Sequence, residues 1–342
     1  MRLSLILTER RNSFTFLCPS LKTHSTQKGI VVGTSNRIET VQAKRRKYVR
    51  SKYTLPEFLV FKLPLLIFVG LLYGMLVWTI VVSFSNWQGT APNFDFAGFK
   101  WYRLMVGLDR FQVDVANNLK WLSLGVIPTV ILAIFIAYLL ELGSFRKLES
   151  YIRTLILYPV AMSFIVTGTI WSWMFDPDKG VLNTILRGVG LGALQGRFDT
   201  NPSTATYWLI LIFVWQYLGF SVIILQASLR TADIHEMTES ALIDGASRLR
   251  ILLQIIIPNI RSGILVLVSL LLISTLKVFD IVYIVTFGGP GSATDVLAFY
   301  MLIATFQQHL VSLGAGIGVI IFLLAAIIVV PYTIYAFRKW FE

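Results

Sequence analysis

Residue types that build metal and redox centres are scarce in this chain. Its 342 residues include one cysteine, Cys18, and three histidines that are far apart. A single thiol cannot close a disulfide within the chain, and no Cys/His cluster has the spacing of a metal site. The sequence also lacks a GxxxxGK[ST] phosphate-binding loop. These absences argue against a metal centre, a disulfide scaffold and a nucleotide-hydrolysing site in this chain.

Charged residues are scarce as well. They make up 14% of the chain, and hydrophobic residues make up 56%. Soluble domains carry about 25% charged residues. Several apolar runs reach the roughly 20 residues that a helix needs to cross a bilayer. The composition therefore predicts an all-α integral membrane protein that crosses the lipid bilayer several times.

The net charge of +12 could indicate a nucleic-acid partner, but its distribution argues against one. Twelve of the 30 Lys and Arg residues precede residue 55, and most of the others flank apolar segments, as membrane topology requires. We predict two parts: a basic, disordered cytoplasmic tail over 1–54, and a membrane domain over 55–342. The basic run at 44–52 is interpreted either as a cytoplasmic anchor or as a contact to anionic lipid headgroups.

Six apolar segments are long enough to be spanning helices. They cover 58–84, 119–140, 154–175, 206–229, 263–286 and 313–337. The apolar stretch at 296–306 is too short to span, and we expect it to be interfacial or re-entrant.

The distribution of Lys and Arg predicts the orientation of these spans. The tail, the C-terminus and the loops 141–153 and 230–262 together hold 21 Lys and Arg, against six in the loops on the other side. Without the tail the ratio is nine to six, with the same sign. The pattern places both termini and the 230–262 loop in the cytoplasm.

The 230–262 loop contains a charged, glycine-containing segment, ESALIDGASRLRILLQIIIPN at 239–259. Its pattern predicts a short helix, a break and a second helix. Ala241, Gly245 and Leu249 recur every four residues and are expected to share one helix face, with Asp244 and Arg248 as an i,i+4 pair. The loop is interpreted either as a projection that docks onto a soluble partner or as a solvated amphipathic connector.

The same segment resembles the EAA–x3–G–x9–I–x–L–P loop of membrane subunits of binding-protein-dependent ABC importers. The spacing matches without a gap, and the departures are Ser240 for Ala and Ile257 for Leu. The resemblance implies that this cytoplasmic loop, between the fourth and fifth spans, is a coupling helix seated on a separate ATPase. The implied coupling residues are Glu239, Ser240, Ala241, Asp244, Gly245, Ala246, Ile255 and Pro258.

A second segment, VFDIVYIVTFGGPGSATDVLAFYMLIATF at 278–306, is similar to the carbohydrate-importer permeases, in particular the larger membrane subunit of maltose-type systems. The resemblance implies a non-enzymatic subunit that forms half of the path for a sugar or glycoside. Its implied partners are a second permease, a cytoplasmic ATPase dimer that holds ATP and magnesium, and an external binding protein. The chain itself would hold no cofactor, and it would lie in the plasma (inner) membrane of a prokaryote.

Polar residues within the predicted spans are candidates for the translocation path. Lys277 and Asp280 are three positions apart and are expected on one face of the fifth span, as path-lining residues or as an ion pair that fixes packing. Gln216 and Tyr217 in the fourth span could line a sugar path or make interhelical hydrogen bonds. The alternative function is a secondary transporter of a small polar solute, but no internal repeat supports it.

Overall fold

The computed structural model describes residues 60, 62–142, 146–192, 196, 198–231 and 234–341. Contacts divide the chain into two units, Met1–Val69 and Gly70–Glu342. The predicted tail over 1–54 lies outside the described residues. The description below concerns the second unit, apart from the first turns of α3.

The described part of the chain is helical, with one isolated bridge between Ser85 and Phe96. The helices in chain order are α3 (Leu63–Ser83), α4 (Lys100–Val106), α5 (Asp109–Lys120), η2 (Trp121–Gly125), α6 (Val126–Leu142), α7 (Arg146–Leu157), η3 (Tyr158–Ala161), α8 (Phe164–Met174), α9 (Val181–Gly188), α10 (Ala205–Thr231), α11 (Ile234–Ile243), α12 (Arg248–Ile251), η5 (Leu252–Ile256), α13 (Ile257–Asn259), α14 (Arg261–Leu276), α15 (Asp280–Val285), α16 (Leu297–Leu302), η6 (Ile303–Gln307) and α17 (Val311–Phe341). The all-α prediction is confirmed.

Four helical stretches in the described residues are long and apolar enough to cross a membrane, and two bent helix pairs raise the number to six. The long ones are Leu63–Ser83, Asp109–Leu140, Ala205–Arg230 and Val311–Tyr335. They match four predicted spans, although the second starts ten residues earlier than predicted because α5 and η2 continue into α6. The stretch 296–306 forms the short apolar helix Leu297–Gln307, and its interfacial or re-entrant placement stays a prediction.

The prediction of one continuous helix over 154–175 is wrong. Thr154–Ala161 and Phe164–Met174 meet at an angle of 110°. Pro159 has no N–H to continue the helical ladder, and Ser163 caps the new helix by accepting a hydrogen bond from the Val166 N–H at 3.3 Å. This break turns α8 away from the direction of α7.

The prediction of one helix over 263–286 is also wrong. Helix α14 ends at Leu276, residues 277–279 are unwound, and α15 begins at Asp280. A further bend of 74° separates Arg248–Asn259 from Arg261–Leu276. The fifth predicted span therefore consists of two helices, α14 and α15, and the bend separates α14 from the preceding η5–α13.

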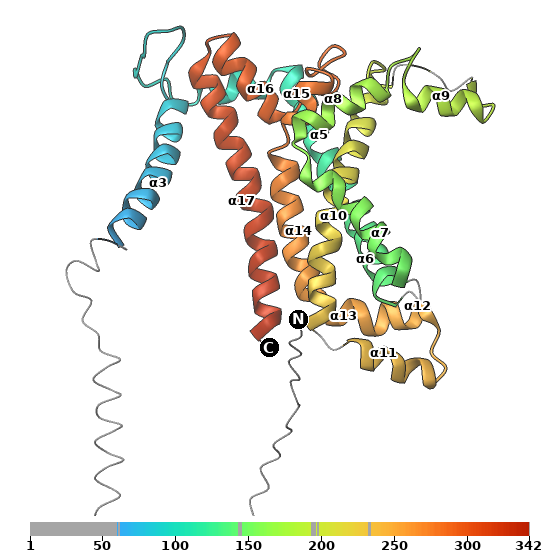
Figure 1. Cartoon of the computed structure of the whole chain (residues 1–342). Helices are drawn as coiled ribbons and strands as arrows, with labels where there is room; N and C mark the ends of the chain where they lie inside the picture. The colour runs from blue at the N-terminus through green and yellow to red at the C-terminus, as the bar shows by residue number, and fades with distance from the viewer. Residues whose placement is uncertain are drawn as a thin grey trace, which may run out of the picture. The chain divides into compact units, whose positions relative to one another are not determined.

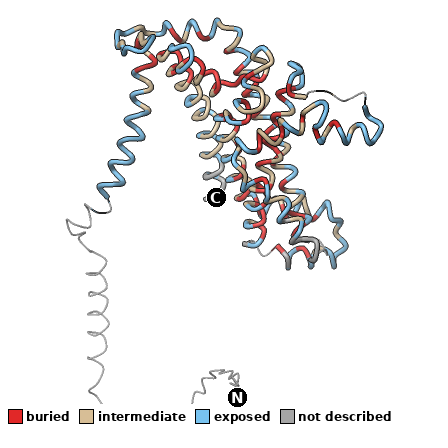
Figure 2. The backbone as a smooth tube through the Cα atoms, turned by 45° about the horizontal axis from the view of Figure 1, so that its top comes forward, coloured by how far each residue is buried: buried red, intermediate tan, exposed pale blue. Residues whose placement is uncertain are grey.

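Buried residues concentrate where the helices of the second unit pack together (Figure 2). Helix α10 contributes to this core and packs against α6, α14 and the break at η3. A close approach occurs at Gly219, where a Cβ atom would lie within 2.1 Å of the Ile156 carbonyl oxygen. Glycine is therefore required there for α7 to reach α10.

The second unit has its connecting segments at two opposite ends (Figure 1). The helices α11 to α13 and the C-terminal end of α17 lie at one end. The helices α8, α15 and α16 lie at the other end. The long helical stretches that run between the two ends are α5–η2–α6, α10, α14 and α17.

Candidate functional site

The predicted helix–break–helix in the 230–262 loop is confirmed over its described residues. Helix α11 is followed by a turn and then by α12, η5 and α13. Buried Ile234, Ile251 and Ile256 fix these helices to the main hydrophobic core. The Tyr138 hydroxyl of α6 also donates a hydrogen bond to the Arg248 carbonyl at 3.2 Å. The loop is thus a rigid projection.

The turn after α11 is built by Gly245. Its φ of +76° lies in the left-handed region, which glycine adopts without the cost that other residues incur. The Ala246 N–H bonds to the Ala241 carbonyl at 2.9 Å, and the Gly245 N–H bonds to the Leu242 carbonyl at 3.1 Å. These two bonds form a Schellman C-cap.

This cap overturns two sequence predictions. Because α11 ends at Ile243, Gly245 and Leu249 do not share a helix face with Ala241, and Asp244 and Arg248 are not an i,i+4 pair within one helix. A Cβ atom added to Gly245 would meet no atom of this chain within 4 Å. Within the chain, the backbone conformation is therefore the reason for glycine at this position.

The surface of the turn combines an apolar centre with charges around it. Ile243 is 87% exposed, and Met237, Leu242 and Leu249 are exposed beside it. Of the predicted coupling residues, Glu239, Ser240, Asp244, Gly245 and Pro258 are exposed, whereas Ala241, Ala246 and Ile255 are half-buried. An exposed apolar patch rimmed by polar groups is typical of a protein–protein contact.

The unwound segment after α14 brings three of the predicted path residues together. Tyr217, Lys277 and Asp280 line a cavity of about 130 Å³. The Tyr217 ring lies 4.3 Å from the Phe213 ring and 5.6 Å from the Phe164 ring, centre to centre. The cavity therefore offers hydroxyl, ammonium and carboxylate groups beside aromatic faces.

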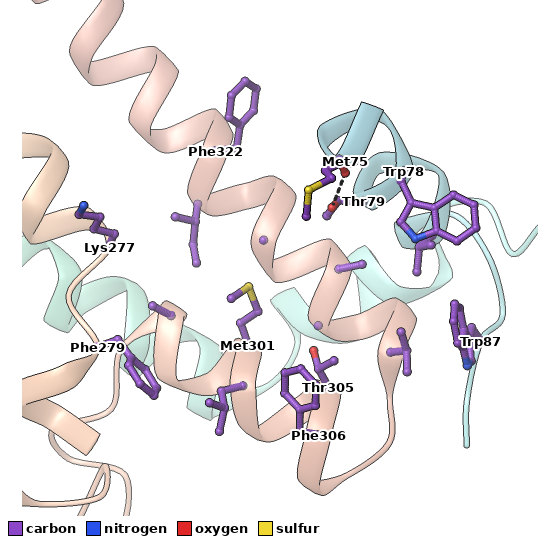
Figure 3. Close-up of a pocket in the computed structure, with 18 of the residues that line it drawn as sticks. Met75, Trp78, Thr79, Trp87, Lys277, Phe279, Met301, Thr305, Phe306 and Phe322 are labelled. Carbon is purple, nitrogen blue, oxygen red and sulfur yellow. Dashed lines mark hydrogen bonds between the residues drawn. The ribbon is translucent and has the colours of Figure 1, made fainter. Parts of the chain in front are cut away.

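Lys277 also borders a second, larger cavity. This cavity measures about 930 Å³ and is mostly apolar, with Phe279, Met301 and Phe322 among its lining residues (Figure 3). Lys277 and Asp280 flank the helix break, so the prediction that they share one helix face is wrong. The described residues show no ion pair between them.

Gln216 does not line either cavity. It is 6% exposed, and its Nε2 donates to the carbonyl oxygens of Pro159 at 3.0 Å and Met162 at 2.8 Å. These are the carbonyls at the α7–α8 break, where regular helical bonding is interrupted. The structure thus shows Gln216 in an interhelical hydrogen bond, the second of its two predicted roles.

Replacing Gln216 with leucine is expected to lower the stability of the assembled protein by about 1–3 kcal/mol, because buried carbonyls lose their donor. The measurement is thermal unfolding of the purified protein in detergent. Gln226→Leu is the matched control, since Gln226 lies on the same helix, is equally buried and has an Nε2 without a hydrogen-bond partner among the described residues. Equal losses for both variants would contradict the anchoring role.

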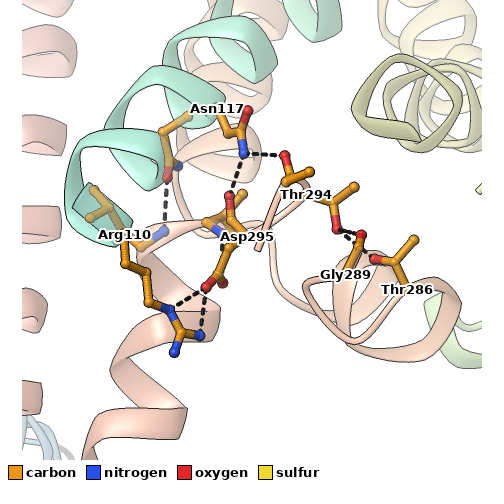
Figure 4. Close-up of polar contacts among 10 residues, drawn as sticks. Arg110, Asn117, Thr286, Gly289, Thr294 and Asp295 are labelled. Atoms are coloured by element: carbon orange, nitrogen blue, oxygen red, sulfur yellow. Dashed lines mark hydrogen bonds and ion pairs between the residues drawn. The ribbon is translucent and has the colours of Figure 1, made fainter. Parts of the chain in front are cut away.

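A polar cluster at the opposite end of the unit was missed by the sequence analysis. Arg110 of α5 forms an ion pair with Asp295, with its Nη2 2.5 Å and its Nε 2.6 Å from Oδ2 (Figure 4). The Asn117 Nδ2 donates to the carbonyls of Ala293 and Asp295, both at 2.8 Å. Burial raises the pKa of the Asp295 carboxyl, and the Arg110 guanidinium opposes that rise.

This cluster fastens the turn between α15 and α16 to α5. The Asn118 Oδ1 accepts the Leu297 N–H at 3.0 Å, and the Thr206 hydroxyl of α10 donates to the Ala293 carbonyl at 3.1 Å. The sequence feature that could have indicated this cluster is the group of polar residues just before the predicted second span. The sequence predicts a loop there.

Comparison with known proteins identifies the family. Residues 129–342, more than half of the chain, match the family described as the binding-protein-dependent transport system inner membrane component. A probable ABC transporter permease of Pyrococcus horikoshii is 36% identical over 291 residues, which cover 85% of this chain and 99% of that protein. The glucose import permease GlcT of Saccharolobus solfataricus is 28% identical and covers 81% of this chain and 95% of its own length.

Solved structures support the same fold. A chain of a bacterial ABC transporter that imports alginate matches with a TM-score of 0.68 at 20% identity, covering 89% of this chain and 99% of that chain. Membership of the family rules out the secondary-transporter alternative. The chain therefore belongs to the binding-protein-dependent ABC importer permeases, as a multi-pass membrane subunit of a prokaryotic transporter that works with a substrate-binding protein and does not itself hydrolyse ATP.

Proposed function

We propose that this permease forms half of the translocation path for a sugar or glycoside. Relatives named as permeases for glucose, xylose and arabinose, diacetylchitobiose and alpha-glucosides support this substrate class. The observation that carries the proposal is the unwound segment 277–279, which borders both cavities. Aromatic faces combined with a few polar groups are suited to sugar rings, whose faces are apolar and whose edges carry hydroxyls.

The α11–α12 projection is the proposed contact to a cytoplasmic ATPase. Its exposed apolar centre at Ile243 would fill a cleft of that partner, with Glu239 and Asp244 at the rim. The C-terminal end of α17 lies at the same end of the unit, in line with a cytoplasmic C-terminus. The plasma membrane, with both termini cytoplasmic, is the proposed location.

The bends give a route from the ATPase to the path. Helix α12 continues through η5 and α13 to the 74° bend before α14, and α14 ends at Leu276, next to Lys277. A displacement of the projection therefore acts on the base of the helix whose far end borders both cavities. The remaining proposed partners are an ATPase dimer and a second permease, with this chain as the larger of the two membrane subunits.

Replacing Lys277 with glutamine is expected to lower sugar uptake about 10–100-fold, because a charge-assisted hydrogen bond contributes about 1.5–3 kcal/mol. The assay is uptake into proteoliposomes that contain the complete transporter and its binding protein. Complex assembly and ATP hydrolysis are measured in parallel and should persist.

Lys100→Gln is the control, since Lys100 is exposed and lines neither cavity. Uptake equal to that of the original protein would contradict a path role for Lys277. Loss of assembly would instead assign Lys277 to helix packing. A separate experiment tests the substrate class. Binding proteins are loaded with neutral sugars, with uronates or with amino acids, and the stimulation of ATP hydrolysis by each is measured.

A further inference from the structure

The segment between α8 and α10 contains α9, a helix with an exposed apolar side. Val181 and Ile185 of α9 (Val181–Gly188) and its C-cap residue Val189 follow at four-residue spacing and are 55%, 55% and 64% exposed. Residues four apart lie on one face of a helix, so these side chains form a continuous apolar ridge. Leu182 packs against the main core from the neighbouring side of the helix.

The segment is held in a fixed orientation. Asn183 is completely buried, and its Nδ2 donates to the carbonyls of Asp176 at 2.9 Å and Gly196 at 3.0 Å. The Gly196 N–H returns a bond to the Asn183 Oδ1 at 3.0 Å. A Cβ atom at Gly180 would lie 2.3 Å from the Asp176 carbonyl oxygen. These contacts hold α9 in place, so the apolar ridge stays exposed and cannot turn toward the core.

The surroundings of α9 are those of a membrane interface. The helix projects sideways from the ends of α8 and α10 (Figure 1). An aromatic group of Phe175, Phe198 and Trp208 lies at its base, with ring centres 4.6–5.9 Å apart. Trp173 at the end of α8 is 70% exposed. Tryptophan concentrates at the headgroup level of a bilayer.

The exposed apolar surface also continues onto the spanning helices. Ile165 of α8, and Tyr207 and Leu211 in the first turns of α10, are exposed. Because the chain is a membrane protein, an exposed apolar band on these helices is suited to lipid. On the polar side of the segment Lys179 and Arg187 are exposed, as is typical of interfacial helices that meet anionic headgroups.

We infer that α9 is an interfacial anchor whose ridge of Val181, Ile185 and Val189 inserts into the outer surface of the lipid bilayer. The ridge enters the boundary between headgroups and acyl chains, and Lys179 and Arg187 remain with the phosphates. Insertion fixes the level of the α8–α10 connection against the membrane. This inference depends on the chain being a membrane protein and is independent of the transported substrate.

The test is the depth of spin labels in the complete transporter, reconstituted in nanodiscs of phosphatidylcholine and phosphatidylglycerol. Single cysteines replace Ile185 or Thr184 in a Cys18→Ser chain, since Thr184 is exposed on the polar side of the same helix. The label at 185 should collide several-fold more with oxygen, and several-fold less with a water-soluble nickel chelate, than the label at 184. Val181→Cys is a second ridge position in case the first variant fails to fold.

Equal access of the nickel chelate to both faces of α9 in nanodiscs would overturn the inference. A second result would also overturn it. If the chelate reaches the label at 185 in nanodiscs but is excluded once the substrate-loaded binding protein is added, the ridge is a protein contact. Shielding at 185 and 181 without the binding protein, with 184 open, supports the membrane anchor.

Discussion

Replacing Ile243 with aspartate is expected to abolish uptake while the chain itself stays folded. Ile243 is 87% exposed, so the substitution removes almost no contact within this chain. A hot-spot side chain near the centre of an interface contributes about 2 kcal/mol or more, and we expect Ile243 to be one. A buried carboxylate in its place adds a desolvation cost. Together these effects correspond to a loss of ATPase affinity of about 100-fold or more.

Two measurements check this expectation. The first is copurification of the ATPase with the tagged permease from detergent-solubilised membranes, and the second is uptake by the complete transporter. Ile243→Leu, which retains an apolar side chain of the same size, is the control and should keep both. If Ile243→Asp keeps its ATPase and transports normally, the loop is a solvated connector and the docking proposal fails.

Replacing Arg110 with methionine is expected to be the most destabilising of the substitutions considered. The Asp295 side chain is fully buried, and the Arg110 side chain is 29% exposed. Removing one partner leaves an uncompensated buried charge, which typically costs about 3–5 kcal/mol. For a chain of this size, the thermal midpoint of the purified protein should fall by about 5–10 °C.

The double variant Arg110→Met with Asp295→Asn separates the ion pair from general damage to packing. It removes the unpaired charge while keeping the shape of the buried group, so it should recover part of the lost stability. If the double variant is as unstable as the sum of both single variants, the two residues are not coupled. The turn between α15 and α16 would then be held by the hydrogen bonds of Asn117, Asn118 and Thr206.

Hydropathy predicted where the chain crosses the membrane, but it could not predict where the spans break. The long helices α10 and α17 follow their apolar runs closely, and α17 continues across Pro331. Hydropathy averaged over a sequence window does not reveal where a helix changes direction. Pro159 marked one break, yet the break after Leu276 contains neither proline nor glycine. The signal there was Lys277 itself, since a charge at that depth favours an unwound, cavity-facing backbone.

The coupling loop was located by its motif, and its local geometry was misread. The sequence Asp244-Gly245-Ala246 was treated as helix interior, although glycine after an apolar helical stretch is a common C-cap. The polar residues before the second predicted span did not reveal the Arg110–Asp295 pairing, because the two residues come from distant parts of the chain. Only the packing of α5 against the turn before α16 brings them together.

The Arg110–Asp295 pair also has a consequence for the order in which the protein is made. The two residues are 185 positions apart. At a synthesis rate of about 5–20 residues per second, Arg110 leaves the ribosome about 10–40 s before Asp295. During that time synthesis of the second span is completed, while Arg110 still lacks the Asp295 carboxylate with which it pairs in the folded protein. The end of the unit formed by α5, α15 and α16 is therefore assembled late. It can form only after the fifth predicted span has entered the membrane.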